Sequence, residues 1–130
     1  MKWSFSNDLP IYAQLIEQIK VGIATGTFEP GERLPSVRDL AMEAGVNPNT
    51  MQRALAQLES EGLVYSQRTA GRFVTEDGAR IIAAKRDLAG RHVQAFITAM
   101  HNLAISREEA LALLKAEYGK ETVKDECPDM

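Results

Sequence analysis

Residues 36–62 read SVRDLAMEAGVNPNTMQRALAQLESEG, and they predict two short helices joined by a tight turn. Ser36 is a favourable N-cap for the first helix, and Asp39, three residues later, completes a capping box. Gly45 is a typical end for that helix, and Asn47 is a favourable N-cap for the next one. Two short helices on either side of a three-residue turn with glycine have the proportions of a helix-turn-helix.

The second of these helices, which ends at Gly62, has one apolar and one polar face. At about 100° per residue, the inner face collects four apolar side chains, Met51, Ala54, Leu55 and Leu58. The opposite face carries Asn49 and Arg53 and has no carboxylate before Glu59. Amides and hydroxyls bind base edges in a major groove, whereas carboxylates are repelled by phosphates. A merely solvated helix face would also be polar, so the neighbouring elements decide between the two interpretations.

The segments on both sides extend the helix-turn-helix into a larger pattern. Apolar residues at helical spacing between Pro10 and Gly26 predict a helix upstream. Residues 63–74 predict a β-hairpin, because two β-prone runs flank a glycine-containing turn. Three helices followed by a hairpin is the order of a winged helix-turn-helix, so we expect a mainly α fold with a small β-hairpin. Arg68 and Arg72 at the hairpin tip make this wing basic.

The composition is that of an ordinary globular protein, with 130 residues, 45% hydrophobic and 25% charged. No apolar run approaches the ~18–20 residues that cross a bilayer, and the N-terminus lacks a signal-peptide core, so we expect a cytoplasmic protein with no membrane partner. Cys127, His92 and His101 are too few for a structural zinc site. Because no catalytic constellation or phosphate-binding loop is visible, we expect no enzyme activity, metal or cofactor.

The charge argues mildly against nucleic acid, since 15 Lys and Arg against 18 Asp and Glu give a net charge of −3. Most nucleic-acid-binding domains are basic, because phosphate neutralisation supplies much of their affinity. Any DNA interaction therefore depends on where a few arginines lie. We expect five of them to share one side of the domain: Arg33, Arg38, Arg53, Arg68 and Arg72.

Four motifs closely resemble the gluconate-repressor-like (GntR) family of bacterial transcription regulators. They are PIYAQL at 10–15, PGERLPSVRDLA at 30–41, NPNTMQRA at 47–54 and LESEGL at 58–63. They follow one another in the family's order over roughly residues 8 to 75. The resemblance implies a DNA-binding dimer that reads an inverted-repeat operator.

The resemblance also implies roles for individual residues. Base contacts would come from Arg38, Asn47, Asn49, Thr50 and Gln52. Contacts to the DNA backbone, which fix register without reading sequence, would come from Arg33, Ser36 and Arg53. Arg68, Gly71 and Arg72 would form the tip of the wing. The wing departs from the family's Arg-Gly-x-Gly pattern, because Thr69 stands where the first glycine is expected and Arg72 where a small residue is expected. Arg72 would favour a narrow, electronegative minor groove.

Residues 1–75 would thus form the DNA-binding domain, residues 76–119 a helical dimerisation region and residues 120–130 a polar, flexible tail. One helix is predicted from Asp77 to about Ile105, and Ser106 would cap another. Two helices cannot bury both flanks alone, so they pack on the winged domain or on another chain. We expect a homodimer, because two recognition helices about 34 Å apart can enter successive major grooves. The residues expected to dimerise are Ile81, Leu88, Phe96, Ile97, Met100, Leu103, Leu111 and Leu114.

The short helical C-terminal region resembles the YtrA-type branch of the family, whose members often repress their own operon. The leading hypothesis is therefore a homodimeric, sequence-specific repressor. The alternative is a winged-helix module that binds other proteins and does not read DNA sequence. A cleft between the C-terminal helices of a dimer could hold a small-molecule effector, but no residue set identifies one.

Overall fold

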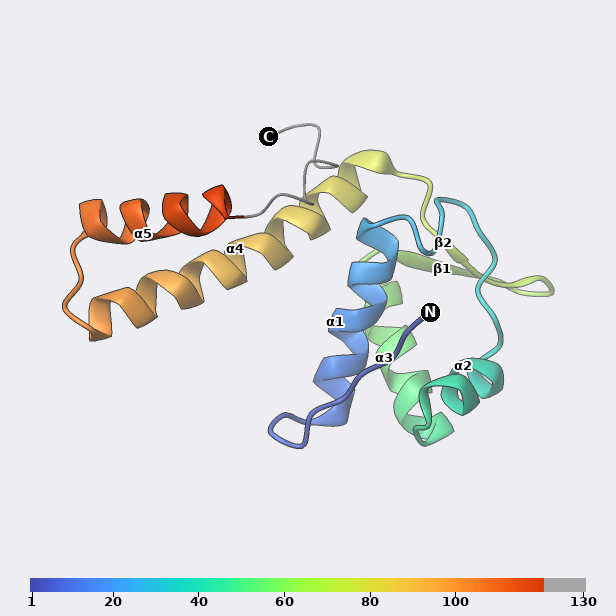
Figure 1. The fold of residues 1–130 in the computed structure, drawn as a ribbon. Helices are drawn as coiled ribbons and strands as arrows, with labels where there is room; N and C mark the ends of the chain where they lie inside the picture. The colour runs from blue at the N-terminus through green and yellow to red at the C-terminus, as the bar shows by residue number, and fades with distance from the viewer. Residues whose placement is uncertain (121–130) are drawn as a thin grey trace. The chain divides into compact units, whose positions relative to one another are not determined.

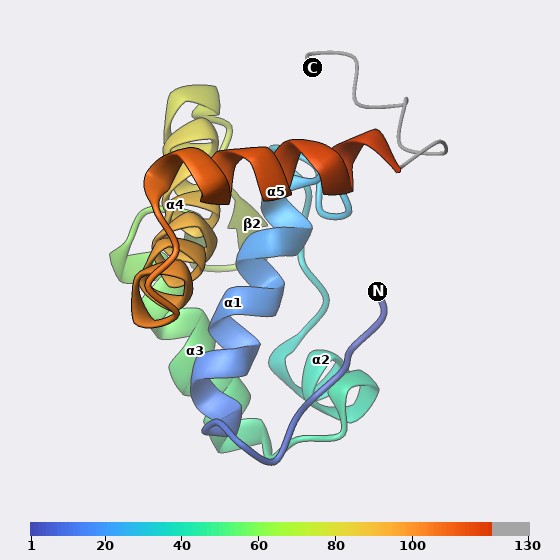
Figure 2. The ribbon, with the colours of Figure 1, turned by 60° about the vertical axis from the view of Figure 1, so that its left-hand side comes forward.

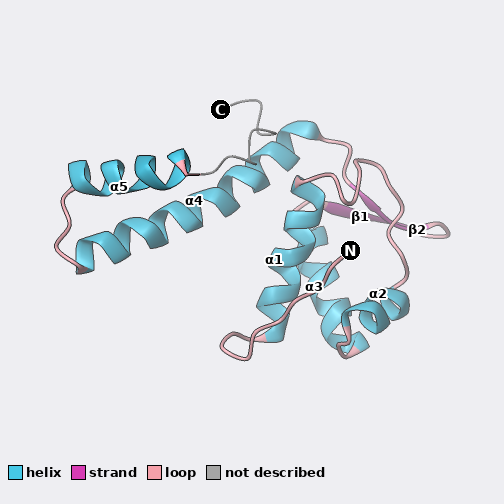
Figure 3. Ribbon diagram, viewed as in Figure 1, coloured by secondary structure: helices cyan, strands magenta, loops and turns pink. Residues whose placement is uncertain are grey.

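The computed structural model describes residues 1–120, which form five α-helices and one antiparallel β-hairpin (Figures 1 and 3). The helices are α1 (Ile11–Ala24), α2 (Val37–Ala44), α3 (Pro48–Ser60), α4 (Gly78–Asn102) and α5 (Arg107–Gly119). The strands are β1 (Val64–Gln67) and β2 (Gly71–Val74). The expected class, mainly α with three helices before a hairpin, is confirmed. The predicted tail beyond Lys120, which includes Cys127, lies outside the described residues.

The chain divides into two compact units, which are described separately. Residues 1–89 form the first, here called the winged-helix unit, and the C-terminal unit begins at Gly90. The division falls within α4, whereas the sequence predicts a domain boundary at residue 75. No helix of residues 1–120 combines the length and the apolar character that crossing a membrane would require.

The core of the winged-helix unit forms where α1 packs beside α3 and α2 packs against the same helix (Figures 1 and 2). The inner face predicted for α3 is buried, with Met51, Ala54, Leu55 and Leu58 at most 1% exposed. Other members of this core are Leu15, Ile19 and Ile23 of α1, Leu40 and Ala41 of α2, and Val64 and Val74 of the hairpin. The hairpin therefore contributes to the same core as the three helices.

Local capping explains where α2 and α3 begin and end. The Ser36 hydroxyl oxygen accepts a hydrogen bond from the Asp39 backbone N–H at 3.0 Å, as the capping box predicts. Gly45 ends α2 in the left-handed conformation, with φ of 72°. Asn47 then caps α3, since its side-chain oxygen accepts from the Asn49 N–H at 2.7 Å. These contacts confirm the expected helix-turn-helix boundaries.

The hairpin also binds the segment that precedes α2. Leu34 N–H donates to the Arg72 carbonyl at 2.8 Å, and Val74 N–H donates to the Glu32 carbonyl at 2.9 Å. Arg33 consequently pairs with Phe73 as an isolated bridge. The backbone around Arg33 is thereby fixed directly beside the wing.

An N-terminal arm, residues 1–10, lies outside the helices and is held by two side-chain amides of α1. Gln14 exchanges two hydrogen bonds with the Ser6 backbone, and Gln18 does the same with Ser4. Trp3 stacks on Phe5 with ring centroids 6.3 Å apart, and both pack against the core.

In the C-terminal unit, α4 ends three residues before the predicted Ile105. Ala104 adopts a left-handed φ of 58°, and Ile105 N–H donates back to the Met100 carbonyl at 3.0 Å. This is a Schellman-type end, which glycine usually provides; here alanine occupies the position, so no residue type marked the end of the helix. Ser106 then caps α5 by accepting from the Glu109 N–H at 3.1 Å, as expected.

Candidate nucleic-acid interface

The outward face of α3 presents polar side chains without a carboxylate along its first turns. Asn49, Gln52 and Arg53 are exposed, and Thr50 is half-buried. Glu59 is the first acid along the helix. The N-terminal end of a helix carries a partial positive charge from its unpaired N–H groups, which favours an anionic partner. The face that the sequence assigns to DNA is therefore accessible and has the right polarity.

Two of the predicted contact residues also serve as helix caps. The Asn47 side-chain oxygen is engaged with the Asn49 N–H, so the side-chain NH₂ remains to meet a base. The Ser36 oxygen accepts from Asp39 N–H, and its hydroxyl proton remains to meet a phosphate. Both residues are exposed, so capping and DNA contact are compatible.

Arg53 is held over an aromatic ring of α1. Its guanidinium carbon lies 4.4 Å from the centroid of the Tyr12 ring. Such stacking uses the face of the guanidinium and leaves its N–H edge available for a phosphate. The structure thus adds Tyr12 to the site as a residue that orients Arg53, a role that the sequence reasoning missed.

A groove of about 380 Å³ separates the wing from the segment that leads into α2. Five of the predicted contact residues line it: Arg33, Ser36, Arg68, Gly71 and Arg72. Arg38 follows directly in the first turn of α2 and is exposed. Residues from two separate motifs are therefore brought to one basic surface, although the chain as a whole is acidic.

Arg72 has a partner within the protein that its sequence position did not reveal. Its Nε atom lies 3.7 Å from Glu59 Oε1, and its side chain is 22% exposed. The Ser66 hydroxyl donates to the same carboxylate oxygen at 3.0 Å. Glu59 belongs to α3, so these contacts tie the wing to that helix. Ser66 and Arg72 are paired in the hairpin register, so their side chains lie on the same face of the wing.

The residues predicted to dimerise separate into three groups. Ile81 packs against the core of the winged-helix unit, and Leu88 is 7% exposed. Phe96 and Met100 are half-buried and line a pocket of about 400 Å³ in the C-terminal unit. The remaining four are at least 37% exposed: Ile97, Leu103, Leu111 and Leu114. Val93 and Leu113 are exposed apolar residues of the same unit that the prediction omitted.

Within residues 1–120, no three His, Cys, Asp or Glu side chains gather in a way that could hold a metal ion.

The sequence is similar to known bacterial regulators. Residues 11–74 match the family described as bacterial regulatory proteins, gntR family. The HTH-type transcriptional regulator YhcF of Bacillus subtilis is 34% identical over 85% of this chain and 92% of its own length. The HTH-type transcriptional repressor YtrA of the same organism is 33% identical over 77% of this chain and 78% of its own.

Solved structures agree with this similarity. A GntR family transcriptional regulator from Listeria monocytogenes superposes with a TM-score of 0.81 at 41% identity, covering 86% of this chain and 98% of that one. The DNA-binding domain of AraR in complex with operator ORX1 superposes with a TM-score of 0.53 at 32% identity. That match covers 58% of this chain and 96% of the other.

Proposed function

The chain belongs to the GntR family of DNA-binding transcriptional regulators, and from this premise we propose that it is a homodimeric repressor of an inverted-repeat operator. In this proposal α3 enters the major groove, the wing contacts the flanking backbone or minor groove, and the C-terminal unit joins two copies. Cytoplasmic action follows from such a role, because the operator is there. An effector would act on the dimer, and no residue set identifies its chemistry.

The observation that carries the proposal is the contrast between the two faces of α3. Its inner face is almost completely buried, so the helix has one orientation, and that orientation exposes Asn49, Gln52 and Arg53. An amide such as Gln52 can bond adenine bidentately, and Arg38 can bond guanine in the same way. We assign base contacts to Arg38, Asn47, Asn49, Thr50 and Gln52, and backbone contacts to Arg33, Ser36 and Arg53.

The exposed apolar surface of the C-terminal unit supports the homodimer. Exposed apolar patches beyond a few hundred Å² usually mark an interface. Ile97 at 50%, Leu103 at 66% and Leu111 at 51% exposure belong to that surface. A two-fold axis through such a surface would also present two copies of α3 to a two-fold operator. The repressor role is supported by the relatives YtrA of B. subtilis and NagR of B. subtilis, both described as repressors.

The decisive experiment replaces Arg38 with Ala and measures binding by fluorescence anisotropy to a duplex that the parent protein selects from random DNA. We expect a loss of about 1–3 kcal/mol for that duplex, or about 5- to 150-fold, with little change for a random duplex. Arg86→Ala is the matched control, because Arg86 is also exposed but lies on α4.

Two outcomes would count against the proposal. Equal binding of the parent protein to selected and random duplexes would favour the alternative, a winged-helix module that binds other proteins. Equal losses in Arg38→Ala and Arg86→Ala would indicate that Arg38 contributes only positive charge.

A further inference from the structure

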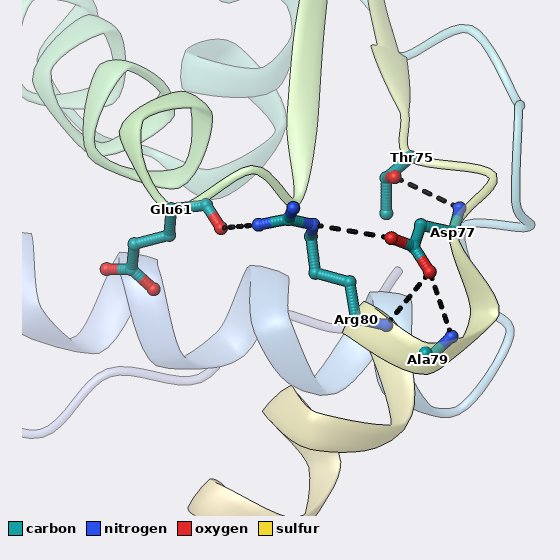
Figure 4. Close-up of polar contacts among 5 residues, drawn as sticks. All are labelled: Glu61, Thr75, Asp77, Ala79 and Arg80. Carbon is teal, nitrogen blue, oxygen red and sulfur yellow. Dashed lines mark hydrogen bonds and ion pairs between the residues drawn. The ribbon is translucent and has the colours of Figure 1, made fainter.

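We propose that Arg80 is a positioning residue that fixes the direction in which α4 leaves the winged-helix unit and thereby selects the spacing between the two half-sites of an operator. This inference rests on the proposed homodimer and adds to it a residue that is not among the proposed DNA or dimer contacts. Arg80 lies in the first turn of α4, and its side chain reaches back to the end of α3 (Figure 4).

Two contacts of the guanidinium form this connection. Arg80 Nη1 donates to the backbone carbonyl of Glu61 at 3.3 Å, and Nε lies 3.7 Å from Asp77 Oδ2. Glu61 is the C-cap residue of α3, and Asp77 is the residue before α4. One planar group thus bridges the end of α3 to the start of α4, as Figure 4 shows.

The α4 side of this bridge is fixed by Asp77. Its Oδ1 atom accepts from the backbone N–H groups of Ala79 and Arg80 at 3.1 and 3.3 Å, which caps the helix. The Asp77 N–H donates to the hydroxyl of Thr75 at 3.1 Å, and Thr75 is 8% exposed. Hydrogen bonds of Thr75 and Asp77 therefore hold the link between the wing and α4, as Figure 4 shows.

The α3 side is fixed by Glu61 and Gly62. The Glu61 carboxylate pairs with Lys20 of α1 at 2.7 Å and accepts from the Gln57 side chain at 2.7 Å. Gly62 has a φ of +80°, and a Cβ at this position would collide with the guanidinium of Arg80. The carbonyl that Arg80 binds consequently belongs to a rigid corner of the unit.

Apolar packing alone leaves the direction of α4 weakly defined. Ile81 and Ala84 are the residues of α4 that pack against the core, and both are only partly buried, whereas Leu88, which is 7% exposed, is not part of that core. A cavity of about 360 Å³ adjoins Ala84 and is lined by Lys20, Glu61 and Arg80, among others. The contacts of Ile81 and Ala84 with the core restrain the tilt of α4 only weakly. The contacts of Arg80 with Glu61 and Asp77 supply a second restraint on that tilt.

The length of α4 turns a small tilt into a large displacement. The helix has 25 residues and runs from Gly78 to Asn102 without interruption, which corresponds to about 37 Å. A tilt of ~10° at its first turn moves the far end by about 6 Å, or nearly two base-pair steps of ~3.4 Å. Because the Arg80 and Asp77 side chains are 51% and 53% exposed, their ion pair adds little to the stability of the fold. We therefore expect this ion pair to affect the direction of α4 and not the stability of the fold.

The test compares full-length parent protein with Arg80→Ala on duplexes that carry the selected half-sites with the spacer shortened or lengthened by one to three base pairs. We expect the parent to bind one spacing at least tenfold better than its neighbours, and Arg80→Ala to reduce this preference to about threefold or less. Affinity for a single half-site should stay within twofold. Asp77→Asn is the second variant, because its amide oxygen can still cap α4 but cannot pair with Arg80. Arg86→Ala is the control and should keep the parental profile.

The outcomes separate this inference from the proposed function. A parental spacing profile in both Arg80→Ala and Asp77→Asn would overturn the role of Arg80 and leave the homodimer intact. A parent protein that binds every spacing equally would contradict the proposed function itself. A loss of half-site affinity in Arg80→Ala would show that the residue supports the fold or α3 directly, which would also overturn its role in spacing.

Discussion

Gly71 shows how much of the wing depends on one backbone conformation. Its φ of +101° lies in a region that L side chains rarely adopt, and an added Cβ would lie 3.2 Å from Arg33 Nε. Glycine at this position allows β2 to begin directly after the turn and leaves room for the side chain of Arg33 beside it. The same residue therefore serves the hairpin geometry and the basic groove.

We expect Gly71→Ala to lower the free energy of unfolding by about 1–3 kcal/mol, because alanine would be strained at this φ. Gly90→Ala is the matched control, since Gly90 lies inside α4 with nothing within 4 Å of an added Cβ. It should raise the free energy of unfolding by roughly 0.5–1 kcal/mol. Urea denaturation of both variants measures the two effects. A change of the free energy of unfolding in the same direction for both variants would contradict the argument.

Residues whose role depends only on their immediate neighbours in the sequence were predicted correctly. Ser36, Asn47 and Ser106 cap their helices as the sequence indicates, because a cap needs only a side chain within three residues of the N–H that it binds. The left-handed conformation of Ala104 was not predicted, because alanine has no preference for that conformation. The difference between the two cases lies in whether the residue type itself prefers the conformation.

Among the elements, the wing was predicted as a hairpin at this place in the chain, but its contacts with α3 were not predicted. The hairpin and its arginines follow from a β-prone pattern around a turn. The ion pair of Arg72 with Glu59 does not, because it joins β2 to the last turns of α3 and depends on how the two elements pack. The wing therefore has one arginine engaged within the protein and one, Arg68, exposed and available.

Arg68 should consequently contribute the wing's phosphate contact. We expect Arg68→Ala to reduce the slope of log K against log salt by about 0.9, with a similar loss on every sequence, because a phosphate contact carries no base information. Anisotropy titrations at several salt concentrations, with selected and random duplexes, measure this slope. Arg86→Ala should leave the slope unchanged. A loss confined to the selected duplex would instead identify Arg68 as a base-reading residue.

For the whole chain, the order of helices and strands was predictable, and the partners of the apolar surfaces were not. Helical periodicity marks Ile81 and Ile97 alike as apolar members of α4. Only the folded chain distinguishes them, since Ile81 packs against the core of the winged-helix unit and Ile97 is 50% exposed. A sequence pattern identifies a buried face, but the surface that buries it depends on the tertiary fold.

Ile97 therefore provides the clearest test of the homodimer. We expect Ile97→Asp to yield a monomer in light scattering, because a carboxylate buried in an apolar interface without a partner costs several kcal/mol. The matched control is Val21→Asp, since Val21 is a 43% exposed apolar residue of α1 and should leave the dimer intact. The monomeric variant should bind a single half-site like the parent and lose the additional affinity for the full inverted repeat. If Ile97→Asp remained dimeric, the interface would lie elsewhere. If both variants bound the full repeat like the parent, each subunit would bind its half-site independently, and the C-terminal unit would have no part in recognising the operator.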